Sequence, residues 1–246
     1  SKVKEKMGEQ LIIINNEKNM GIGYSMKVGF EKAIKFDNEI LLKIDGDGQH
    51  IAEDIPKFVK KIVDENFDYV KGNRFLIKEE IKNMPLNKLI GNLIITTLQK
   101  IISGNYKISD PNNGFIAFKK NILQFVEIKS LKDNYFFENS LLINATAYKL
   151  KIGEVGIKTI YNEEKSSIPL FTASIKLVPT FIAFLFVKNK IGAKYNLSIN
   201  SIVFYLLIFL LVINIFINSY FLWVLIIFIL FLYLGIDLLN FFSKNS

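Results

Sequence analysis

Hydrophobic and polar positions alternate along the first two thirds of the chain in patterns that predict strands and helices in turn. Apolar runs of strand length occupy residues 10–14, 39–44, 67–71, 115–118 and 153–160. Apolar residues at helical spacing predict helices over residues 24–36, 55–63, 86–102 and 136–148. This order predicts an α/β domain.

The last fifth of the chain has a different pattern. Between Ile199 and Phe242 the one ionisable residue other than tyrosine is Asp237. Residues 199–217 and 220–239 are each long enough, at about 1.5 Å per residue, to cross a bilayer core of roughly 30 Å. Asn218 and Ser219 leave room for a tight turn, so we expect a transmembrane hairpin. The alternative is a pair of buried helices in a soluble protein.

Lysines flank this hairpin on both sides. Lys188, Lys190 and Lys194 precede it and Lys244 follows it. The positive-inside rule therefore predicts a multi-pass protein of the cell membrane, with both ends and the α/β domain on the cytoplasmic face.

The composition excludes several kinds of site. The chain has no cysteine and one histidine, which excludes disulfides, thiolate nucleophiles and multi-histidine metal sites. Any metal ion is therefore expected to have oxygen ligands.

The net charge of +8 comes from 31 basic and 23 acidic residues, and Arg74 is the sole arginine. A basic surface suits anionic lipid headgroups and phosphate-bearing substrates. The lysines are dispersed and form no basic recognition helix, so we expect no nucleic-acid partner.

Candidate chemistry concentrates in the segment Asp45-Gly-Asp47-Gly-Gln49-His50, after the strand predicted at 39–44. Two carboxylates at i and i+2 on a strand end point the same way, about 6.6 Å apart along the backbone, and can share one ion. Hard cations such as Mg²⁺ or Mn²⁺ prefer such oxygen ligands. An EF-hand loop does not fit, because His50 and Pro56 stand where it needs Gly and Glu. An acidic turn without a ligand is the alternative.

An ordered set of fragments over residues 10 to about 170 resembles the family 2 glycosyltransferases of GT-A fold, in the dolichyl- or polyprenyl-phosphate mannose synthase branch. The fragments are Asn19-Met-Gly21-Ile-Gly23, Asp45 to His50 with Asp54-Ile-Pro56, Gly72-Asn-Arg74-Phe75, Asp110-Pro-Asn-Asn-Gly114-Phe115, Phe137-Glu138, Glu154-Val155 and Glu164-Lys165-Ser166-Ser167.

The resemblance implies a role for each matching residue. It assigns Asp45, Asp47 and Gln49 to a metal ion that bridges the donor's diphosphate. It places Asn19, Gly21, Gly23 and Asp45 beside the nucleotide sugar, although the glycines equally suit a turn before a helix.

The acceptor side is implied in the same way. Arg74 would meet phosphate, for which a planar guanidinium is suited, and Asp110 would lie near the acceptor, although Asp110 to Gly114 is also good turn chemistry. Lys165, Ser166 and, more weakly, Lys88 would contact the acceptor phosphate. Asp47, Arg74 and Asp110 are the candidate catalytic residues, and Glu138 is expected to be a buried structural partner.

The resemblance implies an inverting transfer of one sugar from a nucleotide sugar to a polyprenyl phosphate, with Mg²⁺ or Mn²⁺ as cofactor. The predicted organisation is a GT-A domain over residues 1–168, an interfacial amphipathic segment over 169–196 and the hairpin over 197–243. A homo-oligomer is possible.

One departure from the family keeps a second hypothesis open. Family members begin with two further strands, which carry an Asn-Glu pair and an Asp-Asp-Gly-Ser sequence and bind the nucleotide. We identify neither strand here, because the chain begins where the helix that follows those strands would lie. We therefore expect either a fragment of the enzyme or a non-catalytic, membrane-anchored accessory protein that retains the scaffold.

Overall fold

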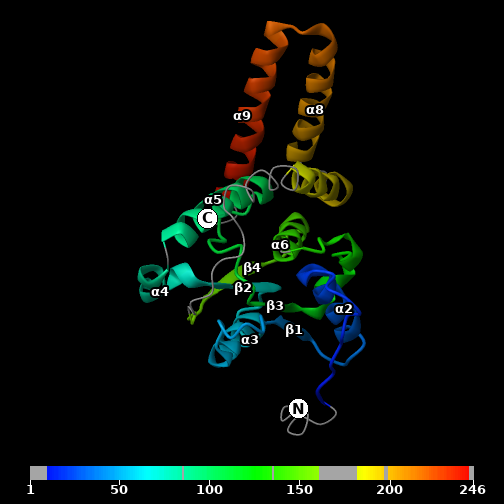
Figure 1. The fold of residues 1–246 in the computed structure, drawn as a ribbon. Coiled ribbons are helices and arrows are strands. Elements are labelled where there is room, and N and C mark those ends of the chain that lie inside the picture. The colour runs from blue at the N-terminus through cyan, green and yellow to red at the C-terminus, as the bar shows by residue number, and fades with distance from the viewer. Residues whose placement is uncertain (1–9, 85, 135, 161–181, 197–198, 244–246) are drawn as a thin grey trace.

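A computed structural model of the chain describes residues 10–84, 86–134, 136–160, 182–196 and 199–243. Within these ranges the molecule consists of an α/β domain and a helical hairpin that projects from one side of it (Figure 1). The mixed α/β class predicted from the sequence is confirmed.

A four-stranded sheet with the order β1-β3-β2-β4 forms the centre of the domain. Its strands are β1 (Ile40–Lys43), β2 (Tyr69–Asn73), β3 (Ile116–Lys119) and β4 (Ile152–Gly156). β3 is antiparallel to both β1 and β2, and β4 is parallel to β2. β1, β2 and β4 therefore end at the same edge of the sheet, where β3 begins.

Two faces of the sheet carry separate apolar clusters because successive side chains of a strand point to opposite faces. On one face, Leu41, Tyr69 and Phe118 pack with α2 (Ile22–Ala33) and α6 (Phe137–Ala147). On the other face, Val70 and Ala117 pack with α3 (Ile55–Val63). The domain thus has three layers, helices over sheet over helix.

The remaining helices connect the strands or lie between the domain and the hairpin. Short helices η2 (Ala52–Asp54), η3 (Arg74–Leu76) and α4 (Lys78–Asn83) follow the strands, and η4 (Lys120–Gln124) and η5 (Ile128–Ser130) precede α6. α5 (Leu86–Ser103) packs against α6 and against a helix over residues 182–191 through a small apolar cluster. Both lie between the sheet and the hairpin (Figure 1).

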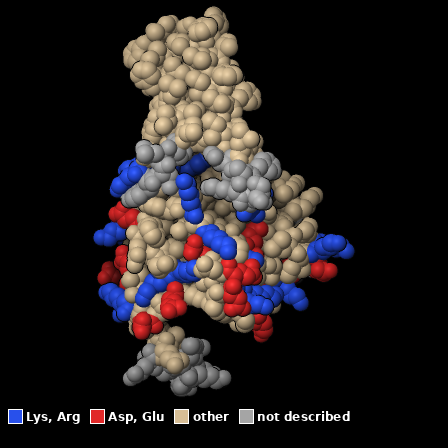
Figure 2. Space-filling model, turned by 180° about the vertical axis from the view of Figure 1, so that it is seen from behind, with Lys and Arg blue, Asp and Glu red and all other residues tan. Residues whose placement is uncertain are grey.

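The hairpin consists of α8 (Ile199–Ile217) and α9 (Tyr220–Ser243), preceded by the turn η6 (Gly192–Asn196). Asn218 adopts a φ of 49°, and the Ser219 amide donates to Asn214 Oδ1 at 2.9 Å, which closes the predicted tight turn. Both helices are long and apolar enough to cross a membrane, by length and composition. Figure 2 shows charged side chains over the domain and none on the hairpin's outer part, on the face that is drawn.

One predicted strand is wrong. Residues 11–14 form no strand, and Ile12, Ile13 and Ile14 are all exposed. A strand requires a neighbour for its backbone hydrogen bonds, and no strand in the described part of the chain pairs with this segment. The other predicted strands and helices are present, with ends shifted by at most four residues.

Candidate active site

The candidate site residues lie at the sheet edge where β1, β2 and β4 end. Asp45 follows β1, Arg74 follows β2, and the turn Asp110 to Gly114 leads into β3. Because β1 and β2 are parallel and β3 is antiparallel to both, these three segments meet although they are distant in sequence.

Asp45 and Asp47 lie beyond the end of β1, where the chain turns. β1 ends at Lys43, and Gly46 and Asp47 lie in a turn, so the common direction that strand geometry predicted for Asp45 and Asp47 does not follow. Asp47 is exposed, and its Oδ1 accepts a hydrogen bond from the Gln49 amide at 3.0 Å. Gly48 has a φ of 74°, which allows the chain to turn here.

Asp45 points inward to a buried cluster of charges. Lys43 Nζ lies 2.6 Å from Asp45 Oδ1 and 2.6 Å from Glu138 Oε1, and His50 Nε2 lies 3.8 Å from Asp45 Oδ2. The close approach of Asp45 requires glycine at position 114, because a Cβ there would overlap the Asp45 carboxylate and come within 2.7 Å of Lys43 Nζ. Glu138 is a buried structural partner, as the sequence predicted.

Opposite charges determine the pKa values in this cluster. Burial alone would raise the pKa of Asp45, but the nearby His50 imidazole and the charge of Lys43 outweigh it and lower this pKa to about 2. Burial would lower the pKa of Lys43, but the carboxylates of Glu138 and Asp45 leave it raised. Both groups therefore stay charged at neutral pH.

A second cluster fixes Arg74. Its Nε and Nη2 donate to the two carboxylate oxygens of Asp110 at 2.7 and 2.8 Å, and its backbone amide donates to Asp110 Oδ2 at 3.1 Å. Asp110 is fully buried. Glu154 accepts from the Ser109 amide at 2.7 Å and from Asn73 Nδ2 at 2.7 Å, so β4 holds the start of the Asp110 turn. Burial raises the pKa of Glu154, and these hydrogen bonds oppose the rise only in part.

Lys71 lies between the two clusters and is fully buried. Its Nζ donates to the Asn113 carbonyl at 2.5 Å. Burial lowers the pKa of Lys71 to about 8, and the charge of Glu138 limits the fall. The sequence motifs did not point to Lys43 or Lys71. Their positions two residues after the core residues Leu41 and Tyr69 were the signal, because i and i+2 on a strand share a face.

The predicted donor residues form the start of α2. Asn19 Oδ1 accepts from the Gly21 amide at 3.0 Å, and Gly21 has a φ of 88°. A Cβ on Gly23 would lie 2.6 Å from the Asp133 carbonyl carbon, so glycine is needed where α2 meets the segment before α6. The structure thus gives both glycines a packing role, while their donor role stays a prediction.

Other predicted residues lie outside these clusters. Lys165 and Ser166 are outside the described residues. Lys88 lies in α5, and its side chain is also outside the described part of the structure.

The donor set at the Asp45 turn fits a hard divalent cation. Asp47 is exposed, and its Oδ2 has no hydrogen bond to any described residue. No group of three or more acidic or histidine side chains that could hold a metal occurs among the described residues. Mg²⁺ is commonly bound by one or two carboxylates, with water and substrate phosphates as its further ligands.

Comparison with known proteins agrees with the resemblance seen in the sequence. The profile of glycosyl transferase family 2 matches residues 1–126. A UDP-N-acetylglucosamine–dolichyl-phosphate N-acetylglucosaminyltransferase of Methanococcus voltae is 37% identical over 154 residues, which are 63% of this chain and 61% of that protein. An uncharacterized protein of Methanocaldococcus jannaschii is 33% identical over 68% of both chains.

Among solved structures, the glucosyl-3-phosphoglycerate synthase of Mycobacterium tuberculosis in complex with Mn²⁺ and UDP-glucose has a TM-score of 0.48 at 16% identity. The match covers 75% of this chain and 59% of that one. A likeness at this level supports no inference about the site. The chain spans 61% of the length of the Methanococcus relative. By the profile match and the sequence identities, the chain belongs to glycosyl transferase family 2.

Proposed function

We propose that the complete protein is a membrane-bound, inverting glycosyltransferase that moves one sugar from a nucleotide sugar to a polyprenyl phosphate. The observation that carries the proposal is the meeting of the Asp45 turn with the Arg74–Asp110 pair at one sheet edge of a family 2 domain. Relatives named as dolichyl-phosphate sugar transferases support the acceptor class.

Asp45, Asp47 and Gln49 are the residues that would hold a Mg²⁺ or Mn²⁺ ion. Such an ion supplies positive charge for the nucleoside diphosphate as it leaves. Lys43 keeps Asp45 ionised and in place from the buried side. Asn19, Gly21 and Gly23 would lie along the nucleotide.

Arg74 would bind phosphate, with Asp110 as its positioning residue. Two hydrogen bonds to one carboxylate fix both the plane and the direction of the guanidinium. Lys165, Ser166 and Lys88 would add contacts to the acceptor phosphate. Bringing two anionic reactants together is then the main contribution of these cations.

The reaction would be a direct displacement at the anomeric carbon. An oxygen of the acceptor phosphate forms the new bond as the bond to the nucleoside diphosphate breaks, so the configuration inverts. A phosphate monoester has a second pKa near 6 and is nucleophilic at neutral pH, so no strong general base is needed.

The hairpin would anchor the domain at the cytoplasmic face of the cell membrane. Lys188, Lys190 and Lys194 before it and Lys244 after it favour this orientation. A polyprenyl phosphate presents its head at the bilayer surface, which is where the hairpin would keep the domain. The segment 169–196 would lie along that surface, and its residues 182–191 are helical.

A screen of radiolabelled nucleotide sugars tests the proposal. Membranes that contain the complete protein are expected to move label from one donor into the lipid fraction when polyprenyl phosphate is added, and membranes without the protein are not. Absence of lipid-linked label with every donor would contradict the proposal and favour a non-catalytic accessory protein.

A further inference from the structure

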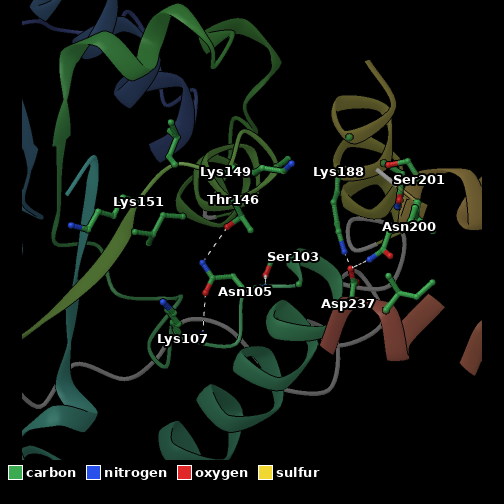
Figure 3. A pocket seen from close by; sticks show the side chains of 18 of the residues that line it. Ser103, Asn105, Lys107, Thr146, Lys149, Lys151, Lys188, Asn200, Ser201 and Asp237 are labelled. Carbon is green, nitrogen blue, oxygen red and sulfur yellow. Dashed lines mark hydrogen bonds and ion pairs between the residues drawn. The ribbon is translucent and has the colours of Figure 1, made fainter. Parts of the chain in front are cut away.

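A cleft lies at the foot of the hairpin, between the hairpin and the α/β domain. It has a volume of about 600 Å³. One wall comes from the domain, with Ser103, Asn105 and Thr146, and the other comes from the hairpin, with Asn200 and Asp237 (Figure 3). Domain and hairpin therefore build it together.

This cleft is separate from the candidate active site. Its domain wall includes Phe67, Lys151 and Ile152, which lie before or at the starts of β2 and β4. Arg74 follows the end of β2, which is parallel to β4. The cleft and the candidate active site thus lie at opposite edges of the sheet.

The charges around the cleft are mostly positive. Lys107, Lys149, Lys151 and Lys188 line it, and Asp237 is the one acidic residue of the lining. Lys188 Nζ lies 2.5 Å from Asp237 Oδ2, and Asn200 Nδ2 donates to Asp237 Oδ1. The single negative charge is therefore already neutralised within the cleft.

Two of these lysines remain for a ligand. Lys151 Nζ donates to the Glu65 carbonyl at 2.7 Å and lies over the Phe67 ring. Lys107 and Lys149 are exposed and have no acidic partner among the described residues. In Figure 3, Lys149 extends toward the side of the cleft that holds Lys188.

The lining also holds buried acceptors without a donor. Asn189 and Asn200 are 1% and 4% exposed, and the Oδ1 atom of each has no hydrogen-bond partner among the described residues. An unpaired buried acceptor is costly, so a ligand with a hydroxyl group would satisfy it. Two free ammonium groups would at the same time favour a phosphate.

We propose that this cleft binds the headgroup of an anionic membrane phospholipid, with its phosphate at Lys107 and Lys149 and its hydroxyl groups toward Asn189 and Asn200. The inference rests on the hairpin crossing the membrane, as in the proposed function. The hairpin's apolar helices begin and end at the cleft, which places it at headgroup depth. Basic pockets beside membrane helices on the cytoplasmic side are suited to such headgroups.

Native mass spectrometry of the full protein in detergent, titrated with phosphatidylglycerol, tests the proposal. Each lysine is expected to contribute about fivefold to binding, so removing both positive charges by Lys107→Gln with Lys149→Gln is expected to weaken binding roughly 25-fold. Phosphatidylcholine should bind the wild type more weakly than phosphatidylglycerol. The matched control, Lys32→Gln with Lys60→Gln, removes two exposed lysines of α2 and α3 and should bind like the wild type.

Further measurements distinguish a lipid headgroup from a free phosphate ester, and loss of charge from misfolding. Lys149→Arg keeps the charge and should keep the affinity. Equal phosphatidylglycerol affinity in the wild type and the double variant would overturn the proposal. Glycerol 3-phosphate binding as tightly as the lipid would overturn the lipid assignment.

Two measurements keep this test distinct from that of the transferase. Flotation with vesicles reports whether the hairpin holds the protein in the membrane, whatever the lysines do. In neutral lipid the double variant should keep its sugar-transfer activity, and loss of that activity would instead make the cleft part of the acceptor site.

Discussion

Buried charges in the candidate site are held by partners whose removal has a measurable cost. Asp110 is fully buried, and both its carboxylate oxygens accept hydrogen bonds from Arg74. Taking away one member of such a pair leaves the other charge uncompensated in a medium of low dielectric constant.

We therefore expect Asp110→Asn to lower the free energy of unfolding by about 3 kcal/mol or more. The double change Arg74→Met with Asp110→Leu should cost less than Asp110→Asn alone, because neither charge remains. Thermal unfolding of the full protein in detergent checks both. A single variant as stable as the exposed control Asp64→Asn would contradict the structure of this pair.

The buried Lys71 predicts that the free energy of unfolding depends on pH. Its pKa is lowered by burial from 10.5 to about 8 in the folded protein. Between these two values the unfolded chain holds a proton that the folded chain has lost, so the free energy of unfolding rises with pH across that interval. Below pH 8 Lys71 is protonated in both states, and its contribution is constant.

The variant Lys71→Met isolates this effect. The stability of the wild type relative to Lys71→Met should increase from pH 8 to pH 10.5 when unfolding is followed by circular dichroism. A difference that does not change with pH would show that Lys71 keeps an ordinary pKa.

The sequence predicted part of this residue-scale chemistry. Motif order placed Asp45, Arg74 and Asp110 together, and the sheet edge brings these segments into one region. It did not predict that Arg74 and Asp110 bond to each other, or that Lys43 and Lys71 are buried. The bond between Arg74 and Asp110 depends on which strands become neighbours, and periodicity within one strand does not contain that information. The burial of Lys43 and Lys71 could have been inferred from their i+2 spacing from core residues.

At the scale of elements, α2 contains two glycines with opposite surroundings. A Cβ on Gly23 would meet the backbone of Lys132 and Asp133, whereas a Cβ on Gly29 would have nothing within 4 Å. Both positions lie within the same helix.

We expect Gly23→Ala to lower the free energy of unfolding by about 1–3 kcal/mol through overpacking. Gly29→Ala should raise it by about 0.5–1 kcal/mol, because alanine loses less entropy than glycine in a helix. Urea or thermal unfolding of the two variants checks the opposite signs. If Gly23→Ala also stabilised the protein, the contact between α2 and residues 132–133 would be wrong.

Helices were easier to predict than strands. Apolar spacing located α3 and α5, and α5 ends just before Gly104, which has a φ of 69°. Residues 10–14 have strand composition, but no strand lies beside them in the described part of the chain. A helix forms its hydrogen bonds within its own segment, while a strand depends on a partner that local sequence does not specify.

At the scale of the whole molecule, the proposed membrane hairpin would determine which side of a membrane each part faces. Its turn at Ser219 lies at the far end of α8 and α9 from the domain (Figure 1). The chain contains no cysteine, so any single cysteine that is introduced is a unique label.

Ser219→Cys should react with a membrane-impermeant maleimide on intact cells, because the proposed orientation puts the turn outside. Lys60→Cys on α3 should react only after permeabilisation. The reverse labelling pattern would show that the hairpin has the opposite orientation. Labelling of both positions in intact cells would argue against a membrane-crossing hairpin.

The most direct test of the account is the transfer rate of the complete protein after a charge is removed from the Asp45 turn. Asp47→Asn is compared with Asp64→Asn, an equal charge change at an exposed position on the end of α3. With saturating Mg²⁺ and the donor found in the screen, we expect Asp47→Asn to lose at least a hundredfold in label transferred to polyprenyl phosphate, and Asp64→Asn to match the wild type. Transfer that survives Asp47→Asn and chelation of divalent ions would contradict the account.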